Sequence, residues 1–272
     1  MKRPWSRVLR WVGHRVPTAL LALCGLAVVG LLWQLTAWAS NPSQVPAPAD
    51  VWHSLTADWH EIPALSYLEF ESGGIGAALA FSTVHVLAGV AVGTAAGLPL
   101  GITLARVRLV RLLLVPPLSL LGSVPLLVLL PFITLWFGTA GFAQSGLVIA
   151  FAFLAVTFAT ERAAVTVSDQ YANYASSLGA TRQRILWTVV LPAAAPTVIG
   201  AIRVALAAGW SWQAVAELLG AHQGVGRVID VSARLGAVSD LAATVLCLAV
   251  VAVACDAIVA RVGGVLVRWR ES

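Results

Sequence analysis

The chain has 272 residues, of which 59% are hydrophobic and only 11% are charged, with a formal net charge of +5. Soluble domains carry about 25% charged residues, so this composition excludes an ordinary water-soluble domain and predicts a membrane protein. The basic residues, all but one of them arginine, lie beside apolar segments, which indicates membrane-topology signals and argues against a nucleic-acid-binding surface.

The N-terminal segment, residues 1–16, is predicted to lie at the cytoplasmic membrane surface. Its apolar residues follow helical spacing among arginines, which favours an amphipathic interfacial helix, with an unstructured basic tail as the alternative. Residues 17–39 then form an apolar run long enough to span a bilayer, which takes about 20 residues. Ala37–Trp38–Ala39 matches a signal-peptide cleavage pattern, but the run exceeds a usual signal core, so we expect an uncleaved first span.

Residues 40–75 are predicted to form an external segment, because they contain no lysine or arginine. Residues 49–59 suit a short interfacial helix, since Trp52 and Trp59 are the residue type that gathers at the membrane surface. The second span is expected over residues 76–105.

Four glycines recur at every fourth position of the second span: Gly89, Gly93, Gly97 and Gly101. Small residues at this spacing let two helix backbones approach closely in lipid, so the glycine stripe predicts a tight helix–helix contact. His85 lies in the same span, and we interpret it as a hydrogen-bonded structural residue, with a proton relay as the alternative.

Arg106, Arg108 and Arg111 mark a short cytoplasmic loop before the third span, residues 112–137. Prolines interrupt this span, and the backbone carbonyls that they free are tolerated at membrane depth only beside protein or a watery cavity. Ser123 and Pro125 are therefore candidates for the lining of a solute pathway, and a kink without ligand contact is the alternative.

The remaining apolar runs complete a six-span arrangement. A short external turn is expected at residues 138–144, followed by a fourth span at residues 145–160 and a polar loop at residues 161–192. The fifth span is expected at residues 193–219, an external connection at residues 220–239 and the sixth span at residues 240–262. Fourteen of the 17 basic residues then fall in or beside cytoplasmic segments, which places both termini inside. The predicted fold is an all-α polytopic membrane protein, with a single six-span domain over residues 17–272.

The polar loop at residues 161–192 reads as a helix, a glycine turn and a second helix. Ser168 or Asp169 can cap the first helix, and Thr181 can cap the second, by accepting a backbone N–H of the first turn. Gly179 suits the left-handed residue that ends a helix. A helical hairpin on the wet side of a membrane protein predicts contact with another protein, and an ordinary cytoplasmic loop is the alternative.

Three stretches in and after this loop resemble the "EAA" loop of ABC-importer permeases: Tyr171–Ala172–Asn173–Tyr174–Ala175, Leu178–Gly179–Ala180 and Leu191–Pro192. The resemblance is closest to the permeases for sulfonate, nitrate and taurine uptake. It extends from Val45–Pro46–Ala47–Pro48 to Arg268–Trp269–Arg270. Asn173 stands where the family usually has glutamate.

The resemblance implies a bacterial plasma-membrane permease subunit of an ATP-driven importer, for a small organic or inorganic anion. ABC ATPase subunits, an extracytoplasmic solute-binding protein and a second permease copy are the implied partners; we expect a homodimer, with pairing to a similar permease left open. The 168–187 loop would be the coupling helix, with ATPase contacts at Tyr171, Asn173, Ala175, Leu178, Gly179, Ala180 and Arg182. ATP and Mg would bind the partner ATPase, and we expect no cofactor on this chain.

No sequence motif for covalent chemistry or phosphate binding is present, so we predict that the chain is not an enzyme and that another chain hydrolyses ATP. The three cysteines lie in apolar runs, which favours buried small side chains over a metal site. A secondary transporter or channel working without an ATPase is the alternative function.

Two charged residues lie inside the predicted spans and need partners. Arg203 in the fifth span and Asp256 in the sixth are expected at similar depth, so we predict that they pair, with snorkelling of Arg203 to the interface as the alternative.

Four residues near the external end of the fifth span are candidates for an external gate or the solute passage: Trp210, Trp212, Gln213 and Glu217. The resemblance supports this role, because the fifth span lines the pathway in related importers and Glu217 matches a recurring acidic position. Placement of the tryptophans in the interfacial belt is the alternative.

Overall fold

The computed structural model describes residues 18–62, 73–138, 145–166, 174–219 and 222–267, and these residues form helices joined by turns, without a β-strand. The predicted helix at residues 1–16 lies outside the described residues. Five helices are long and apolar enough to cross a membrane, and a bent helix pair brings the number of candidate spans to six. The prediction of an all-α, multi-span membrane protein is therefore confirmed, while the cytoplasmic placement of both termini stays a prediction.

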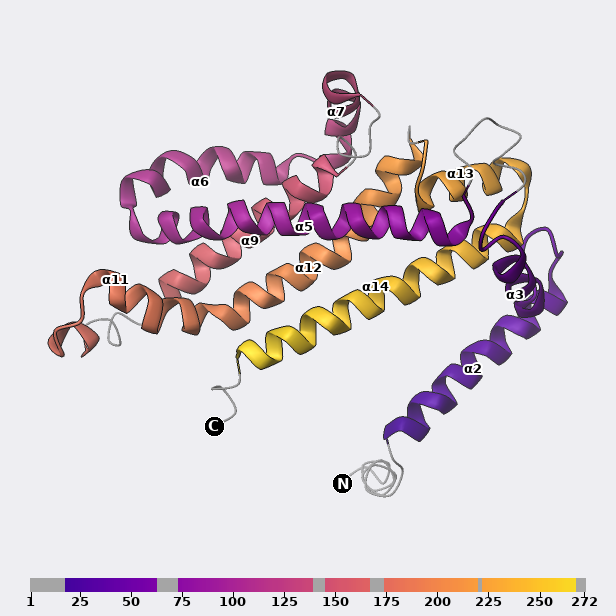
Figure 1. Ribbon diagram of the computed structural model, residues 1–272, viewed down its shortest axis with the longest axis horizontal. Helices are drawn as coiled ribbons and strands as arrows, with labels where there is room; N and C mark the ends of the chain where they lie inside the picture. The colour runs from indigo at the N-terminus through magenta and orange to yellow at the C-terminus, as the bar shows by residue number, and fades with distance from the viewer. Residues whose placement is uncertain (1–17, 63–72, 139–144, 167–173, 220–221, 268–272) are drawn as a thin grey trace, which may run out of the picture.

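The first span, α2 (Thr18–Ala39), stands apart from the other spanning helices (Figure 1). It contacts α3 (Pro48–Ala57), the short helix predicted at residues 49–59, and leaves most of its side chains exposed. The indole Nε1 of Trp33 donates a hydrogen bond to the Pro46 carbonyl, 3.1 Å away, which anchors the end of α2 beside the start of α3.

The centre of the bundle is the contact between α5 (Ile75–Arg106) and α9 (Gly146–Thr166), which the glycine stripe produces. A Cβ added at Gly93 would lie 2.7 Å from the Ile149 carbonyl oxygen, and one at Gly97 would lie 2.7 Å from the Phe153 carbonyl oxygen. Atoms cannot approach so closely, so hydrogen is the only side chain that this contact accepts. The predicted close helix–helix contact is present.

The third span, expected over residues 112–137 with interruptions at its prolines, is broken sharply at one of them. It consists of α6 (Arg108–Ser123), the 3-10 helix η1 (Leu126–Leu129) and α7 (Leu130–Phe137), and the two halves are bent by 91°. The bend falls at Val124, which is extended (φ −75°, ψ 129°) because it precedes Pro125. Pro116 and Pro117 lie inside α6 without ending it.

The fifth span starts earlier than predicted. A short helix, α11 (Arg182–Ile185), runs through a π-helical stretch, η2 (Leu186–Val190), into α12 (Leu191–Leu218) without a break. The sixth span is α14 (Val238–Leu266).

The connection between the fifth and sixth spans contains a helix that the sequence reading missed, α13 (Val225–Leu235). Its apolar residues Val225, Val228 and Val231 are buried in a cluster with side chains of α3, α5 and α14. Figure 1 shows α13 and α3 at one end of the bundle and α11 at the other.

Candidate coupling loop and buried polar sites

The described part of the predicted coupling loop ends its first helix at Gly179, which has φ +79°. The Gly179 N–H donates to the Ser176 carbonyl, and the Ala180 N–H donates to the Ala175 carbonyl, at 2.9 and 3.1 Å. This pair of hydrogen bonds around a left-handed glycine is the Schellman ending of a helix. The helix–glycine–helix prediction is therefore present in the geometry of this segment.

Thr181 then begins the second helix. Its Oγ1 accepts the Arg184 N–H at 3.3 Å, which is the side-chain cap that the sequence predicted. Because α11, η2 and α12 are continuous, the turn at Gly179 is joined to the fifth span without a flexible connection.

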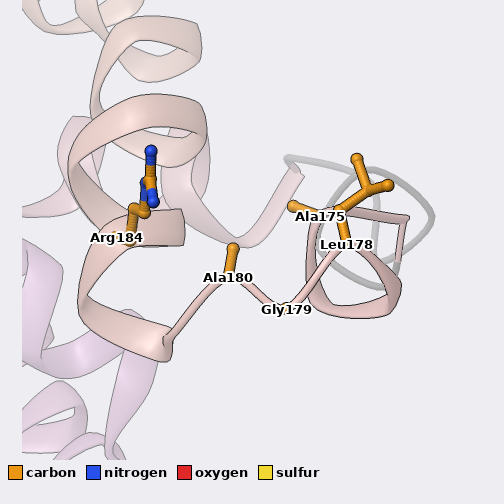
Figure 2. Close-up of a pocket in the computed structure, with 5 residues that line it drawn as sticks. All are labelled: Ala175, Leu178, Gly179, Ala180 and Arg184. Carbon is orange, nitrogen blue, oxygen red and sulfur yellow. The ribbon is translucent and has the colours of Figure 1, made fainter.

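The residues around the Gly179 turn line a half-open concavity of about 260 Å³: Ala175, Leu178, Gly179, Ala180 and Arg184. Figure 2 shows the Leu178 side chain directed away from α11, and it is 73% exposed. Tyr174 and Trp187 are also largely exposed on the same segment. Exposed apolar side chains around a concavity are typical of a protein-docking surface.

Part of the predicted contact set falls outside the described residues. Tyr171 and Asn173 lie there, as do the possible caps Ser168 and Asp169. Arg182 is the first residue of α11. The ATPase-contact roles of all seven predicted residues stay predictions.

Arg203 and Asp256 form the ion pair expected between α12 and α14. The Arg203 Nε and Nη2 atoms donate to the two carboxylate oxygens of Asp256 at 2.8 and 2.7 Å. Two parallel bonds of this kind fix the orientation of both groups. The side chains remain 45% and 37% exposed, so the pair lies on the surface of the single chain.

The predicted pathway residues do not share one environment. Ser123 and Pro125 are exposed at the bend between α6 and η1, where the Ser123 hydroxyl donates to the Ser119 carbonyl. Trp212 is half-buried against Phe151, with ring centroids 6.3 Å apart.

The other three candidates, Trp210, Gln213 and Glu217, are buried inside the single chain. Contact with a passing solute would require a movement that exposes them, and their pathway role stays a prediction.

The carboxylate of Glu217 is the centre of a buried hydrogen-bond network. It accepts from the Ser82 hydroxyl at 2.8 and 2.9 Å, from Gln213 Nε2 at 2.9 Å and from the Gly226 N–H at 2.9 Å. The Ser82 hydroxyl in turn accepts the Val225 N–H at 3.0 Å. His85 lies one turn beyond Ser82, and its Nδ1 is 2.8 Å from the Phe81 carbonyl oxygen.

Several of these partners were not identified from the sequence. Ser82 gives no local signal, because a serine in an apolar span has many uses. The Gly224–Val225–Gly226 pattern was the available sign of a close backbone approach.

An ion pair that the sequence did not predict lies at the same end of the bundle as α11. Arg111 Nη2 at the start of α6 is 2.9 Å from the Glu161 carboxylate, near the end of α9, and Glu161 is almost fully buried. It links α6 to the helix that leads into the coupling loop.

Residues 97–271 match the family described as binding-protein-dependent transport system inner membrane component. The chain belongs to this family. It is thus a multi-pass inner-membrane protein and the permease subunit of an ABC importer.

Two relatives cover most of the permease. It is 27% identical over 249 residues to the taurine transport system permease protein TauC of Escherichia coli (strain K12), covering 91% of this chain and 88% of that one. It is 30% identical over 201 residues to the putative aliphatic sulfonates transport permease protein SsuC of Bacillus subtilis (strain 168), covering 74% of this chain and 73% of that one.

Its fold resembles a chain of the MetNI methionine ABC transporter in an inward-facing conformation, with a TM-score of 0.61. That similarity covers 70% of this chain and 94% of the other, at 18% identity.

Proposed function

We propose that this permease imports a small organic or inorganic anion, such as taurine, another sulfonate or a nitrate-like ion, using ATP hydrolysed by separate subunits. The similarity to permeases named for taurine and for aliphatic sulfonates supports this substrate class. A solute-binding protein would deliver the anion, as the family description implies. Two permease copies, most simply identical, would enclose the pathway between them.

The geometry of the coupling loop is the main observation that supports the ATP-driven mechanism. The loop places exposed Tyr174 and Leu178 beside a half-open concavity, and it continues into α12 without a break in the helix. A docked ATPase dimer that closes on ATP would move this loop, and α12 would carry the movement into the membrane. The assembly would then alternate between outward-facing and inward-facing states, each favoured by a different ligand.

The experiment is an affinity purification of the full-length permease from its native membrane, scored for a co-purifying ABC ATPase. Leu178→Asp should abolish the ATPase band, because it places a charge on the exposed apolar docking surface. The matched control is Leu235→Asp, since Leu235 is 57% exposed at the opposite end of the bundle. Replacement of residues 170–184 with a Gly/Ser linker should also remove the ATPase.

The substrate is tested separately, by uptake of radiolabelled taurine, an alkanesulfonate and nitrate into cells with and without the gene for the permease. Uptake of at least one of these anions should depend on the permease. If no ATPase co-purifies with correctly folded native protein, the ATP-driven mechanism is wrong, and a secondary transporter or channel replaces it. If the ATPase is present but no anion is taken up, the substrate class is wrong.

The predicted pathway residues give a further test of this function. Under the proposal, Ser123, Pro125, Trp210, Trp212, Gln213 and Glu217 border the path in at least one state of the cycle. Trp212→Ala should lower uptake while leaving assembly with the ATPase unchanged. Normal uptake by this variant would exclude Trp212 from the pathway.

A further inference from the structure

The start of α13 is held by a carboxylate that belongs to a different helix. Glu217 lies near the end of α12, and its side chain accepts the N–H of Gly226, the second residue of α13. The first N–H groups of a helix have no partner within the helix, and a negative charge there is favourable. Glu217 therefore acts as a helix cap supplied from outside α13.

Ser82 on α5 completes this contact from the opposite side. Its hydroxyl donates to the Glu217 carboxylate and accepts the N–H of Val225, the first residue of α13. One serine thus connects α5, α12 and α13 through two buried hydrogen bonds. Ser82, Gln213 and Glu217 are each at most 2% exposed, so water does not compete for these bonds.

The glycines on either side of Val225 show how closely α13 approaches α12. A Cβ at Gly224 would lie 2.3 Å from the Glu217 carboxyl carbon, and one at Gly226 would lie 2.1 Å from the Ala214 carbonyl oxygen. Gly224 also has φ +98°, which other residues rarely adopt. The start of α13 therefore rests directly on the last turns of α12.

The rest of α13 packs over one end of the bundle through its apolar face. Its buried valines face α3, α5 and α14, while Asp230 pairs with Arg227 and Arg234 at 2.6 and 2.8 Å. These two ion pairs lie within α13 itself. The Glu217–Ser82 network, in contrast, connects α13 to two spanning helices.

The position of Glu217 along α12 gives this network a mechanical role. The 28 residues of α12 extend for about 42 Å at 1.5 Å per residue. Its first turn follows the coupling loop through α11 and η2, and its last turn carries Glu217. A displacement of the loop that moves α12 as a rigid body is thus delivered to the start of α13.

We propose that Glu217 and Ser82 are positioning residues that fasten α13 to α12 and α5, so that α13 moves with α12 during transport. In this role Glu217 links the coupling loop to the helix covering the opposite end of the bundle, and its carboxylate need not contact the solute. The cause of the α12 movement, a docked ATPase, rests on the proposed function. The attachment itself can be measured without transport.

The first measurement is hydrogen–deuterium exchange of the full-length permease in lipid nanodiscs, followed on peptides from residues 224–236. Ser82→Ala removes both bonds of the hydroxyl and should raise amide exchange in α13 by about tenfold, as expected when a buried donor loses its partner. Exchange in α9 should not change. Thr83→Ala is the matched control, because the Thr83 hydroxyl bonds to the Leu79 carbonyl of its own helix.

Glu217→Gln separates the fastening role from a role for the negative charge. The introduced amide oxygen can accept from Ser82 and Gly226, and its NH2 can donate to Gln213 Oε1, which has no hydrogen-bond partner among the described residues. Rotation of the Gln213 amide completes this arrangement. Glu217→Gln should therefore retain the slow exchange of α13, and Glu217→Ala should lose it.

The second measurement is the number of solute molecules transported per ATP, for the permease assembled with its ATPase and binding protein in proteoliposomes. Ser82→Ala should lower this ratio at least about threefold, while Thr83→Ala keeps it. Unchanged exchange of α13 in Ser82→Ala would overturn the attachment. Faster exchange with an unchanged ratio would overturn the proposed role in transport.

The two measurements also separate this inference from the proposed function. If no ATPase assembles with the native permease, the proposed function fails and with it the movement attributed to α12. The exchange experiment would still decide whether Glu217 and Ser82 hold α13.

Discussion

Replacing Gly97 with alanine should disturb the contact between α5 and α9. The added Cβ would lie 2.7 Å from the Phe153 carbonyl oxygen, whereas ordinary contacts begin near 3.4 Å. The oxygen belongs to the backbone of α9 and cannot rotate away. The two helices must therefore separate by about 0.7 Å.

The cost follows from three terms. Overpacking a tightly packed site costs about 1–3 kcal/mol. Separation also weakens the hydrogen bond from the Thr157 hydroxyl to the Gly97 carbonyl, a further loss of about 0.5–1.5 kcal/mol. Against these, alanine is favoured over glycine inside a helix by about 0.5–1 kcal/mol. We expect Gly97→Ala to lower the free energy of unfolding by about 2 kcal/mol.

The assay is reversible unfolding of the purified permease in mixed micelles, followed by tryptophan fluorescence during titration with a denaturing detergent. Gly264→Ala in α14 is the matched control, because no described residue has an atom within 4 Å of the added Cβ. The control should be neutral or slightly more stable than the native protein. Equal unfolding midpoints for the two variants would refute the close-contact explanation of the glycine stripe.

Three other changes have defined outcomes. Reversing the charge of either Arg203 or Asp256 should lower the yield of folded permease, and reversing both should restore it; a double variant as poor as the single ones would show that the bidentate pair does not stabilise the fold. Gly179→Val should raise the number of ATP molecules hydrolysed per solute imported, because φ is +79°, which a β-branched residue rarely adopts, although no described residue lies within 4 Å of an added Cβ. Gly179→Asn should have a smaller effect, since asparagine tolerates this conformation. Native coupling in Gly179→Val would exclude Gly179 from the mechanism. Burial, and then the nearby Asp240 carboxylate, raise the pKa of the Asp58 carboxyl. The folded state therefore binds this proton more tightly than the unfolded state does, and the free energy of unfolding falls as pH rises through the elevated pKa. Thermal unfolding should therefore show Asp58→Asn stabilised at pH 7, with the gain vanishing below pH about 4, and an equal gain at both pH values would contradict this explanation.

The spanning helices and their closest contact could be predicted because lipid imposes simple requirements on a sequence. A span must be long and apolar, so the ends of α5 differ from the predicted residues 76–105 by one residue at each end. Small residues repeated every four positions bring backbones together, which identified the glycine stripe. A charge inside a span needs a partner, and this requirement led to the prediction that Arg203 and Asp256 pair.

Features that depend on contacts between distant segments were not predictable in the same way. The serine hydroxyl at position 82 and the carboxylate at position 217 are separated by 135 residues, and no local pattern joins them. The charged residues of α13 recur at helical spacing, which is a signal for an amphipathic helix, but the segment was interpreted only as an external connection. The break at Pro125 was treated as a kink within one span, because four prolines are spread through that region and the sequence does not show which one ends a helix.

The π-helical stretch at Leu186–Val190 sets the rotational phase between the coupling loop and the fifth span. A π-turn accommodates one more residue than the α-helix around it, and each α-helical residue corresponds to about 100° of rotation. Rewinding the same five residues as regular α-helix would turn the Gly179 turn by about that angle relative to α12, whereas removing one residue together with the π-turn would leave the angle nearly unchanged. The five residues of η2 therefore determine which side of the fifth span is aligned with the Gly179 turn.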